Sequence, residues 1–215
     1  MSKFSYESDL ARLCFDCAVR SGRVNNIYFA GNPVKRFFIR RNFNHVLSGL
    51  GYVARRGKCL DFGPGVGIML PALAKEFKHV VAIDIDENQL NSANTLVSRC
   101  EIDNVEFILG KEENELGIFE DSAFDCIIAD NVLEHIESTE LIISEFYRIL
   151  SDSGVLIVSL PSQNVIYRMF ESKDDGHVLR TYSQIIDLIG KLRNQYSRLN
   201  EFDVFPFFKT FALTK

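Results

Sequence analysis

The sequence predicts an α/β protein built on a doubly wound, mostly parallel sheet. From Lys58 onward, short apolar runs alternate with stretches of helical periodicity, which is the pattern of consecutive βαβ units. The first of these runs ends in closely spaced glycines, as in folds where a buried strand turns tightly into a helix. Two aromatic-rich runs near the end of the chain flank Pro206, and their short connection allows only antiparallel pairing.

The predicted strands and helices follow one another in a regular order. Five apolar runs rich in β-branched residues are expected to form strands, at 59–62, 79–84, 105–109, 124–129 and 154–160. Helical periodicity occupies the intervening stretches 68–77, 87–100 and 139–150. An amphipathic helix from Tyr182 to about Arg193 and two closing strands, at 199–205 and 207–213, complete the domain.

Two further helices are predicted ahead of the sheet, in an N-terminal segment of residues 1–57 that precedes a domain at 58–215. The first helix runs from Phe4 to about Arg20, where apolar residues recur at helical spacing. The second covers residues 33–50, and Pro33 suits the first position of a helix. Because aromatic and basic residues alternate along it, this helix is expected to form a lid over a binding cleft or to contact a membrane surface.

The composition fits one globular domain. The chain has 215 residues, of which 47% are hydrophobic and 25% charged, and this excludes a disordered protein. No apolar run reaches the roughly 18 to 20 residues of a membrane span, and the acidic N-terminus is unlike a secretory signal. A cytoplasmic protein is therefore expected.

The five cysteines are scattered along the chain, which argues against a disulfide framework. Cys14 and Cys17 are interpreted as buried small hydrophobes.

The net charge of −5 is unevenly distributed. No Asp or Glu occurs between Cys17 and Leu60, although Lys and Arg are frequent there. Such a stretch can steer an anionic partner, or it can pair with the acidic remainder of the chain. Arg36, Arg40 and Arg41 are candidates to bind a phosphate or carboxylate of a substrate. Nucleic acid is disfavoured by the overall acidity and by the absence of an RNA-binding module.

The most informative segment is LDFGPGVG, in which a strand ends in Gly63, Gly65 and Gly67. Glycines there let the backbone turn tightly and approach a ligand, and the following helix N-terminus favours a polar or anionic group. The next strand ends in Asp84, where a doubly wound fold places a carboxylate against ribose hydroxyls. Ile68 stands where the dinucleotide pattern has its third glycine, so a nicotinamide oxidoreductase is disfavoured.

The ordered motifs LDFGPGVG, VVAIDID, FDCIIADNVLEHIE and RILSDSGVLIVSLP resemble those of class I S-adenosylmethionine-dependent methyltransferases. The resemblance extends from about Lys58 to the C-terminus. It implies a seven-stranded sheet of order 3-2-1-4-5-7-6 with strand 7 antiparallel. It also implies S-adenosylmethionine as the cofactor and transfer of its methyl group to a small-molecule, glycan or lipid-linked acceptor, with oxygen as the expected acceptor atom.

The resemblance further implies where the donor is held. Asp61 and the three glycines would line its amino-acid end, Asp84 would bind the ribose, and Ile85 would flank the adenine. Many family members carry an acid after the third strand to meet the adenine amine. Lys111 and Glu112 occupy that stretch here in place of the usual Gly-Asp.

The segment after the fourth strand is implied to border the methionine portion and the transferred methyl, through Ala129, Asp130 and Asn131.

Two other classes of function are alternatives to a methyltransferase. A non-catalytic S-adenosylmethionine-binding module is compatible with Lys111 and with Asn131. An oxidoreductase is disfavoured by the antiparallel closing pair.

Two histidines are candidate general bases. His135 follows the fourth strand, and His177 lies where related enzymes return over the substrate pocket; imidazole titrates near neutrality. Glu134 with His135 also resembles the Glu-His of metal-assisted O-methyltransferases, in which a divalent cation lowers the pKa of the attacked hydroxyl. Asn131 stands where that motif has its first Glu, so no metal ligands are assigned. Alternatively, Glu134 is an acid at a helix N-terminus and His135 packs against the sheet edge.

Overall fold

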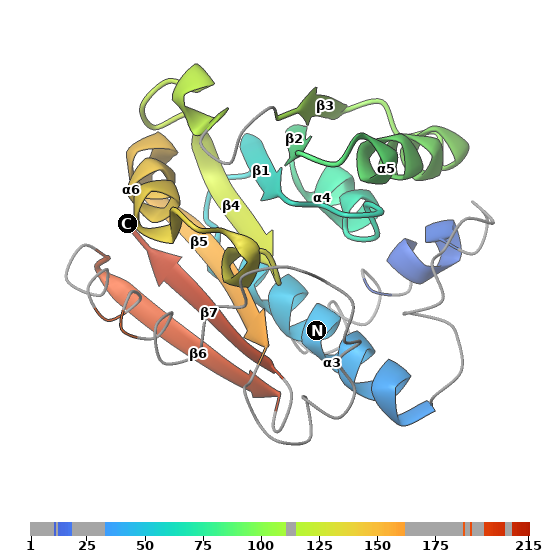
Figure 1. Cartoon of the computed structure of the whole chain (residues 1–215), viewed down its shortest axis with the longest axis horizontal. Helices are drawn as coiled ribbons and strands as arrows, with labels where there is room; N and C mark the ends of the chain where they lie inside the picture. The colour runs from blue at the N-terminus through green and yellow to red at the C-terminus, as the bar shows by residue number, and fades with distance from the viewer. Residues whose placement is uncertain are drawn as a thin grey trace.

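The computed structural model describes residues 11, 13–18, 33–110, 115–161, 187, 190, 196–204 and 208–215. Its centre is a seven-stranded sheet of order β3-β2-β1-β4-β5-β7-β6 (Figure 1). The parallel strands are β1 (Lys58–Phe62), β2 (His79–Asp84), β3 (Val105–Leu109), β4 (Phe124–Asp130) and β5 (Leu150–Pro161). Strands β6 (Arg198–Val204) and β7 (Phe208–Thr214) pair antiparallel, and β7 also runs antiparallel to β5. The predicted fold class and strand order are confirmed.

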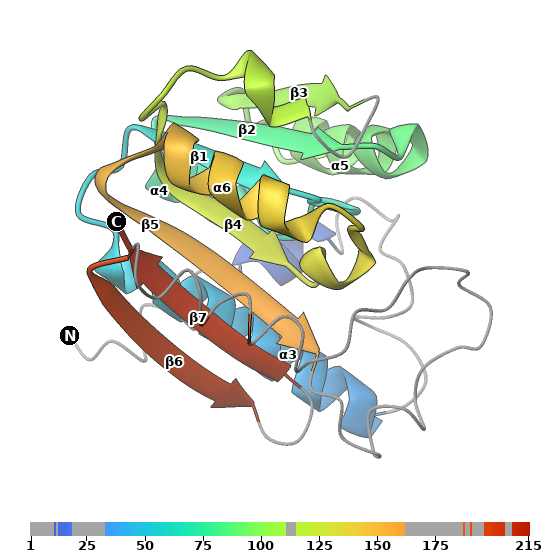
Figure 2. The same ribbon diagram turned by 60° about the vertical axis from the view of Figure 1, so that its left-hand side comes forward.

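Helices cover both faces of this sheet (Figures 1 and 2). The longer helices are α3 (Pro33–Gly49), α4 (Leu70–Glu76), α5 (Glu87–Arg99) and α6 (Thr139–Ile149). Short 3-10 helices are η1 (Leu50–Tyr52), η2 (Glu115–Ile118) and η3 (Leu133–His135). Helices α3, α4 and α5 share one core with one face of the sheet, and α6 packs on the other face.

Two hydrophobic cores follow from the alternation of side chains along the strands. Cys59 and Leu60 are neighbours in β1 and are both fully buried, yet they belong to opposite cores. This is expected for strands covered on both faces, whose sequences are apolar throughout instead of alternating. Helix α5 begins where Asp86 acts as its N-cap, with the carboxylate accepting from the backbone N–H groups of Asn88 and Gln89. Strand β5 begins at Leu150, earlier than predicted, because Leu150 already pairs with Phe124 across a bulge.

The C-terminal half of α3 is part of the main core. Phe43, Val46 and Leu47 are at most 1% exposed and pack in the same cluster as β1 and β5. These apolar side chains are therefore covered by protein. The side chains of residues 33–39 lie outside the described part of the structure, so a lid or membrane role for them stays a prediction. Within the described residues, no helix is long and apolar enough to cross a bilayer.

Two other predicted helices lie largely outside the described residues. Of the helix expected at 4–20, residues 11 and 13–18 are helical, and Cys14 and Cys17 are buried. Of the helix expected at 182–193, only residues 187 and 190 are described, and both are helical.

Candidate active site

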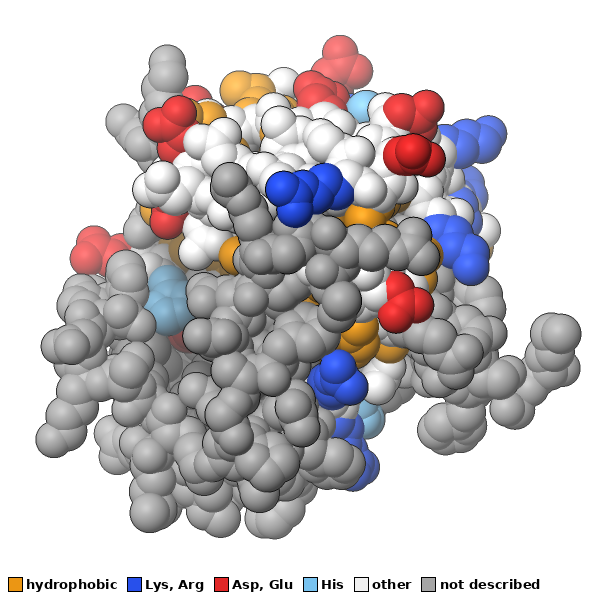
Figure 3. All heavy atoms as spheres, turned by 90° about the vertical axis from the view of Figure 1, so that its right-hand side faces the viewer, with side chains coloured by type: hydrophobic (Ala, Val, Ile, Leu, Met, Phe, Trp, Pro, Cys, Tyr) orange, Lys and Arg blue, Asp and Glu red, His pale blue; other side chains and the backbone are white. Residues whose placement is uncertain are grey.

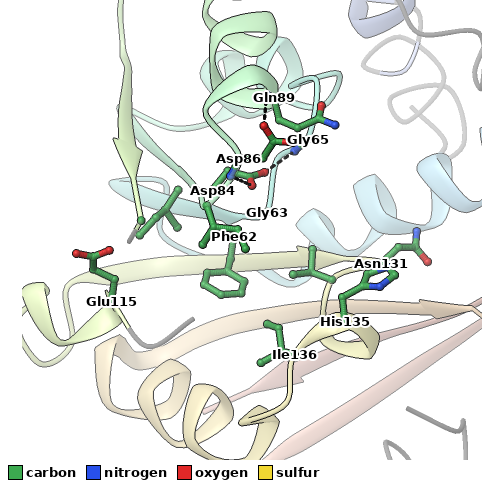
Figure 4. Close-up of a pocket in the computed structure, with 14 residues that line it drawn as sticks. Phe62, Gly63, Gly65, Asp84, Asp86, Gln89, Glu115, Asn131, His135 and Ile136 are labelled. Atoms are coloured by element: carbon green, nitrogen blue, oxygen red, sulfur yellow. Dashed lines mark hydrogen bonds between the residues drawn. The ribbon is translucent and has the colours of Figure 1, made fainter. Parts of the chain in front are cut away.

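A cavity of about 630 Å³ opens at the carboxyl ends of β1, β2 and β4 (Figure 4). In doubly wound sheets this edge is where ligands bind. The cavity is lined by Phe62, Gly63, Gly65, Ile83, Asp84, Ile85, Asp86, Gln89, Gly110, Glu115, Asn131, Val132, His135 and Ile136. Apolar side chains thus form much of the wall, while polar groups come from the ends of the strands.

The three glycines after β1 all have positive φ, but their surroundings differ. A Cβ at Gly63 would lie 2.5 Å from a methyl of Val132, and one at Gly67 would lie 2.6 Å from the Cβ of Ala93. These two positions need glycine because protein packs against them. A Cβ at Gly65, in contrast, would meet no atom of the described residues within 4 Å. Gly65 therefore leaves open space against the backbone, where a ligand can approach.

The carboxylate of Asp84 is fixed beside this turn. Its Oδ2 accepts from the backbone N–H of Gly65 at 3.3 Å, and its Oδ1 accepts from that of Asp86 at 3.0 Å. Burial raises the pKa of Asp84, while the backbone N–H groups of Asp86 and Gly65 lower it. Figure 4 shows Asp84, Asp86 and Gln89 grouped around Gly65. The site thus presents an oriented carboxylate next to an exposed stretch of backbone.

Behind the cavity wall lie three further carboxyl groups, of Asp61, Asp130 and Glu134. Asp61 and Glu134 are each 2% exposed, and within the described residues Asp61 Oδ2 and Glu134 Oε2 have no hydrogen-bond partner. Burial, together with the nearby carboxyl groups of Asp130 and Asp84, raises the pKa of Asp61 to about 8. Burial likewise raises the pKa of Glu134 to about 8. Such groups are stabilised as carboxylates when a cation comes close.

The far wall of the cavity carries His135, on η3, and Asn131. Figure 4 shows these two residues across the cavity from Glu115. The side chain of His135 is 42% exposed, and its Nε2 lies 4.0 Å from Oε1 of Glu134. Asn131 has a left-handed φ of 53°, and its backbone N–H donates to the carbonyl of Ser159 at 3.0 Å. An imidazole therefore reaches the cavity while a buried carboxyl stands behind it.

The structure places the predicted site residues in three groups. Those that line the cavity are Gly63, Gly65, Asp84, Ile85, Asn131 and His135. Those that are described but lie behind its wall are Asp61, Gly67, Ala129, Asp130 and Glu134. Those that lie outside the described residues are Lys111, Glu112 and His177. Among the described residues, no three His, Cys, Asp or Glu side chains are arranged to hold a metal ion.

Several lining residues were missed by sequence reasoning. Phe62, Val132 and Ile136 appear in the sequence as ordinary core residues, although they form the apolar wall. No motif in the neighbouring sequence marks Glu115 as a site residue. It lines the cavity because the tertiary fold brings it there. Its Oε2 lies 3.5 Å from the position that a Cβ of Gly110 would take, so the carboxylate stands at the end of β3.

The basic residues near β1 belong to the opposite end of the sheet. Arg55 lies 3.4 Å from the carboxylate of Asp125, and Arg56 lies 3.4 Å from that of Glu76. These two arginines therefore pair with acidic residues of the same chain, which is one of the two roles expected for the basic segment. On the face of the molecule in Figure 3, the basic and acidic side chains that are described are interspersed.

Part of the chain is similar to known methyltransferases. The family model for a methyltransferase domain, Methyltransf_11, matches residues 60–158. Phosphoethanolamine N-methyltransferase 2 of Caenorhabditis elegans is 28% identical over 102 residues, which are 47% of this chain and 23% of that protein. The chain thus matches about a quarter of the length of this curated relative.

Solved structures share the fold. The PH0226 protein of Pyrococcus horikoshii OT3 superposes with a TM-score of 0.68 and 23% identity, over 89% of this chain and 96% of that one. A SAM dependent methyltransferase from Aquifex aeolicus gives 0.61 and 20%, over 79% and 88%. Haemonchus contortus phosphoethanolamine N-methyltransferase 2, in complex with S-adenosyl-L-methionine, gives 0.62 and 17%, over 90% and 60%. Residues 60–158, which match the model of a methyltransferase domain, contain the glycine turn, Asp84 and β4 on a sheet of this strand order.

Proposed function

We propose that this chain transfers a methyl group from S-adenosylmethionine to a small-molecule acceptor. The observation that carries the proposal is the open backbone at Gly65, which faces the cavity beside the oriented carboxylate of Asp84. When bound, S-adenosylmethionine supplies an activated methyl group on a sulfonium sulfur. The predicted cofactor is the methyl donor of this family.

The residues present fit this donor. Asp84 offers carboxylate oxygens for ribose hydroxyls, and Ile85, which is 63% exposed, offers an apolar surface for the adenine. Glu115 stands near the end of β3, where related enzymes often place an acid for the adenine amine. The orphaned oxygens of Asp61 and Glu134 suit a ligand that carries positive charge on its ammonium and sulfonium groups.

The task of the protein is to position the acceptor and to exclude water. His135 is the candidate general base, since it lines the cavity and imidazole as a side-chain type can accept a proton at neutral pH. An acceptor hydroxyl would give its proton to His135 as the oxygen attacks the methyl carbon. Glu134 lies 4.0 Å from the imidazole, and its ionised carboxylate would stabilise the protonated ring.

Nitrogen is the second candidate acceptor atom. An amine suits the acidic surroundings of the cavity, and two similar proteins are phosphoethanolamine N-methyltransferases. Arg41 is exposed, and it stays a candidate to bind an anionic group of the acceptor. Arg40 instead lies with its guanidinium 4.3 Å from the centre of the Phe15 ring. Lipid or glycan acceptors and a cytoplasmic location stay predictions.

The proposal is tested in two steps. Calorimetry with S-adenosylmethionine, S-adenosylhomocysteine and NADH should show binding of the two sulfur nucleotides and none of NADH. Methyl transfer from labelled donor is then measured with a panel of hydroxyl and amine acceptors, half of each class carrying a phosphate. Transfer to a hydroxyl or to an amine decides between the two acceptor atoms. Donor binding without transfer to any acceptor would support the non-catalytic module, and binding of NADH alone would refute the proposal.

A further inference from the structure

Asn42 is a buried polar residue on α3, far in sequence from the donor motifs. It is 3% exposed, and its Nδ2 donates to Oδ1 of Asp130 at 3.1 Å. Its Oδ1 accepts from the hydroxyl of Ser159 at 3.0 Å and from that of Thr210 at 3.4 Å. The amide thus joins α3 to β4, β5 and β7, and both of its polar atoms have partners.

This network reaches the cavity through Asp130. The same Oδ1 of Asp130 also accepts from Nδ2 of Asn131 at 2.9 Å, and Asn131 lines the cavity. The pKa of Asp130 is raised by burial and lowered by its hydrogen bonds to Ser159 and Asn42. Asn42 therefore favours the ionised form of the carboxylate that holds Asn131 in place.

We infer that Asn42 is a positioning residue of the active site: it holds Asp130, and through it Asn131, in the wall of the cavity. The inference rests on the proposed function, which makes this cavity the site of methyl transfer. It assigns to the N-terminal helix a direct part in shaping a site whose recognisable motifs all lie after Lys58. The alternative is that the network serves only to satisfy buried polar groups.

Asn42→Asp separates these two possibilities, because it places a second carboxylate against Asp130. The double variant Asn42→Asp with Asp130→Asn exchanges amide and carboxylate. In that variant Ser159, Thr210 and the new amide all donate to the transferred carboxylate. The hydrogen bond to Asn131 is kept once the Asn131 amide turns over, so that its Oδ1 accepts from position 130 in place of its Nδ2 donating to it. Asn44→Ala is the matched control, since Asn44 is an asparagine on the same helix and is only half-buried.

The readout is the Kd of S-adenosylhomocysteine by calorimetry at 25 °C, beside the thermal midpoint of each variant. We expect Asn42→Asp to weaken binding about tenfold, the exchanged double variant to recover most of it, and Asn44→Ala to bind like the parent protein. Wild-type affinity in Asn42→Asp, with a lowered midpoint alone, would overturn the inference. Should Asn42→Asp not fold, Asn42→Ser, which adds no charge, is measured in its place, and wild-type affinity there would equally overturn it. If the parent protein itself fails to bind, the proposed function falls first and this inference with it.

Discussion

Gly65 gives the sharpest test of the donor site, because an added methyl group there meets no atom in the part of the chain that the structure describes. Its φ of 54° is the left-handed region, which costs about 1 to 2 kcal/mol for a residue with a Cβ. For a chain of this size, each 1 kcal/mol lowers the thermal midpoint by about 2 to 4 °C. We therefore expect Gly65→Ala to fold, with a midpoint roughly 2 to 8 °C lower.

Donor affinity should respond far more strongly than stability. The new methyl points into the space that the proposed ligand occupies, so we expect at least about tenfold weaker binding of S-adenosylhomocysteine, or 1.4 kcal/mol. Gly67→Ala is the matched control. Its Cβ would lie 2.6 Å from the Cβ of Ala93, and overpacking adds about 1 to 3 kcal/mol to the backbone cost.

The assay is calorimetric titration together with thermal unfolding of both variants. The expected pattern is a stable protein with poor binding for Gly65→Ala and a larger loss of stability for Gly67→Ala. If Gly65→Ala binds S-adenosylhomocysteine with wild-type affinity, the glycine turn does not cradle the donor and the proposed site is wrong.

Three other predictions follow from the site. Asp84→Asn should weaken donor binding about tenfold or more by calorimetry, since a neutral amide replaces the carboxylate that faces the ribose; an unchanged Kd would contradict the assignment. His135→Asn should lower kcat about 10²-fold or more for a hydroxyl acceptor while the Kd of S-adenosylhomocysteine stays constant, whereas equal loss of both would point to a structural role. Because the pKa of Asp61 is raised to about 8 in the folded protein, the native state retains a proton that the unfolded state loses near pH 4. The free energy of unfolding should therefore fall between about pH 4 and pH 8, by up to about 1.4 kcal/mol per pH unit, and Asp61→Asn should reduce this slope in urea titrations at pH 6 and pH 8.

The donor half of the site was predictable because its residues are encoded locally. The turn from β1 into α4 holds the glycines within one short motif, and Asp84 ends the very next strand. In a parallel sheet, the ends of β1 and β2 must meet at one edge, so sequence order alone brings these groups together. The same logic placed Asn131 and His135 after β4.

Glu115 could not be predicted in this way, since its position depends on a distant helix. It lies on η2, whose carbonyls are held by Arg148 of α6: the guanidinium donates to Leu116 O at 3.2 Å and to Phe119 O at 2.9 Å. Arg148 also pairs with Asp121 at 2.7 Å. A tertiary contact of this kind has no period or motif by which the sequence could reveal it.

The expected role of α3 shows a different limit of sequence patterns. Its aromatic and basic residues predicted a lid or a membrane surface. The pattern shows that one face of the helix is apolar, but it does not show which part of the protein packs against that face. Gly49 approaches Ile157 of β5 so closely that a Cβ would lie 2.9 Å from its Cδ1, so here the cover is the sheet itself. The overlooked signal was Asn42, a polar residue directly beside the buried Phe43. A polar side chain on a buried helix face needs a partner, and on this sheet that partner is Asp130, where β4 ends at the cavity. A helix that sequence composition assigns to the periphery is thereby tied to the wall of the active site.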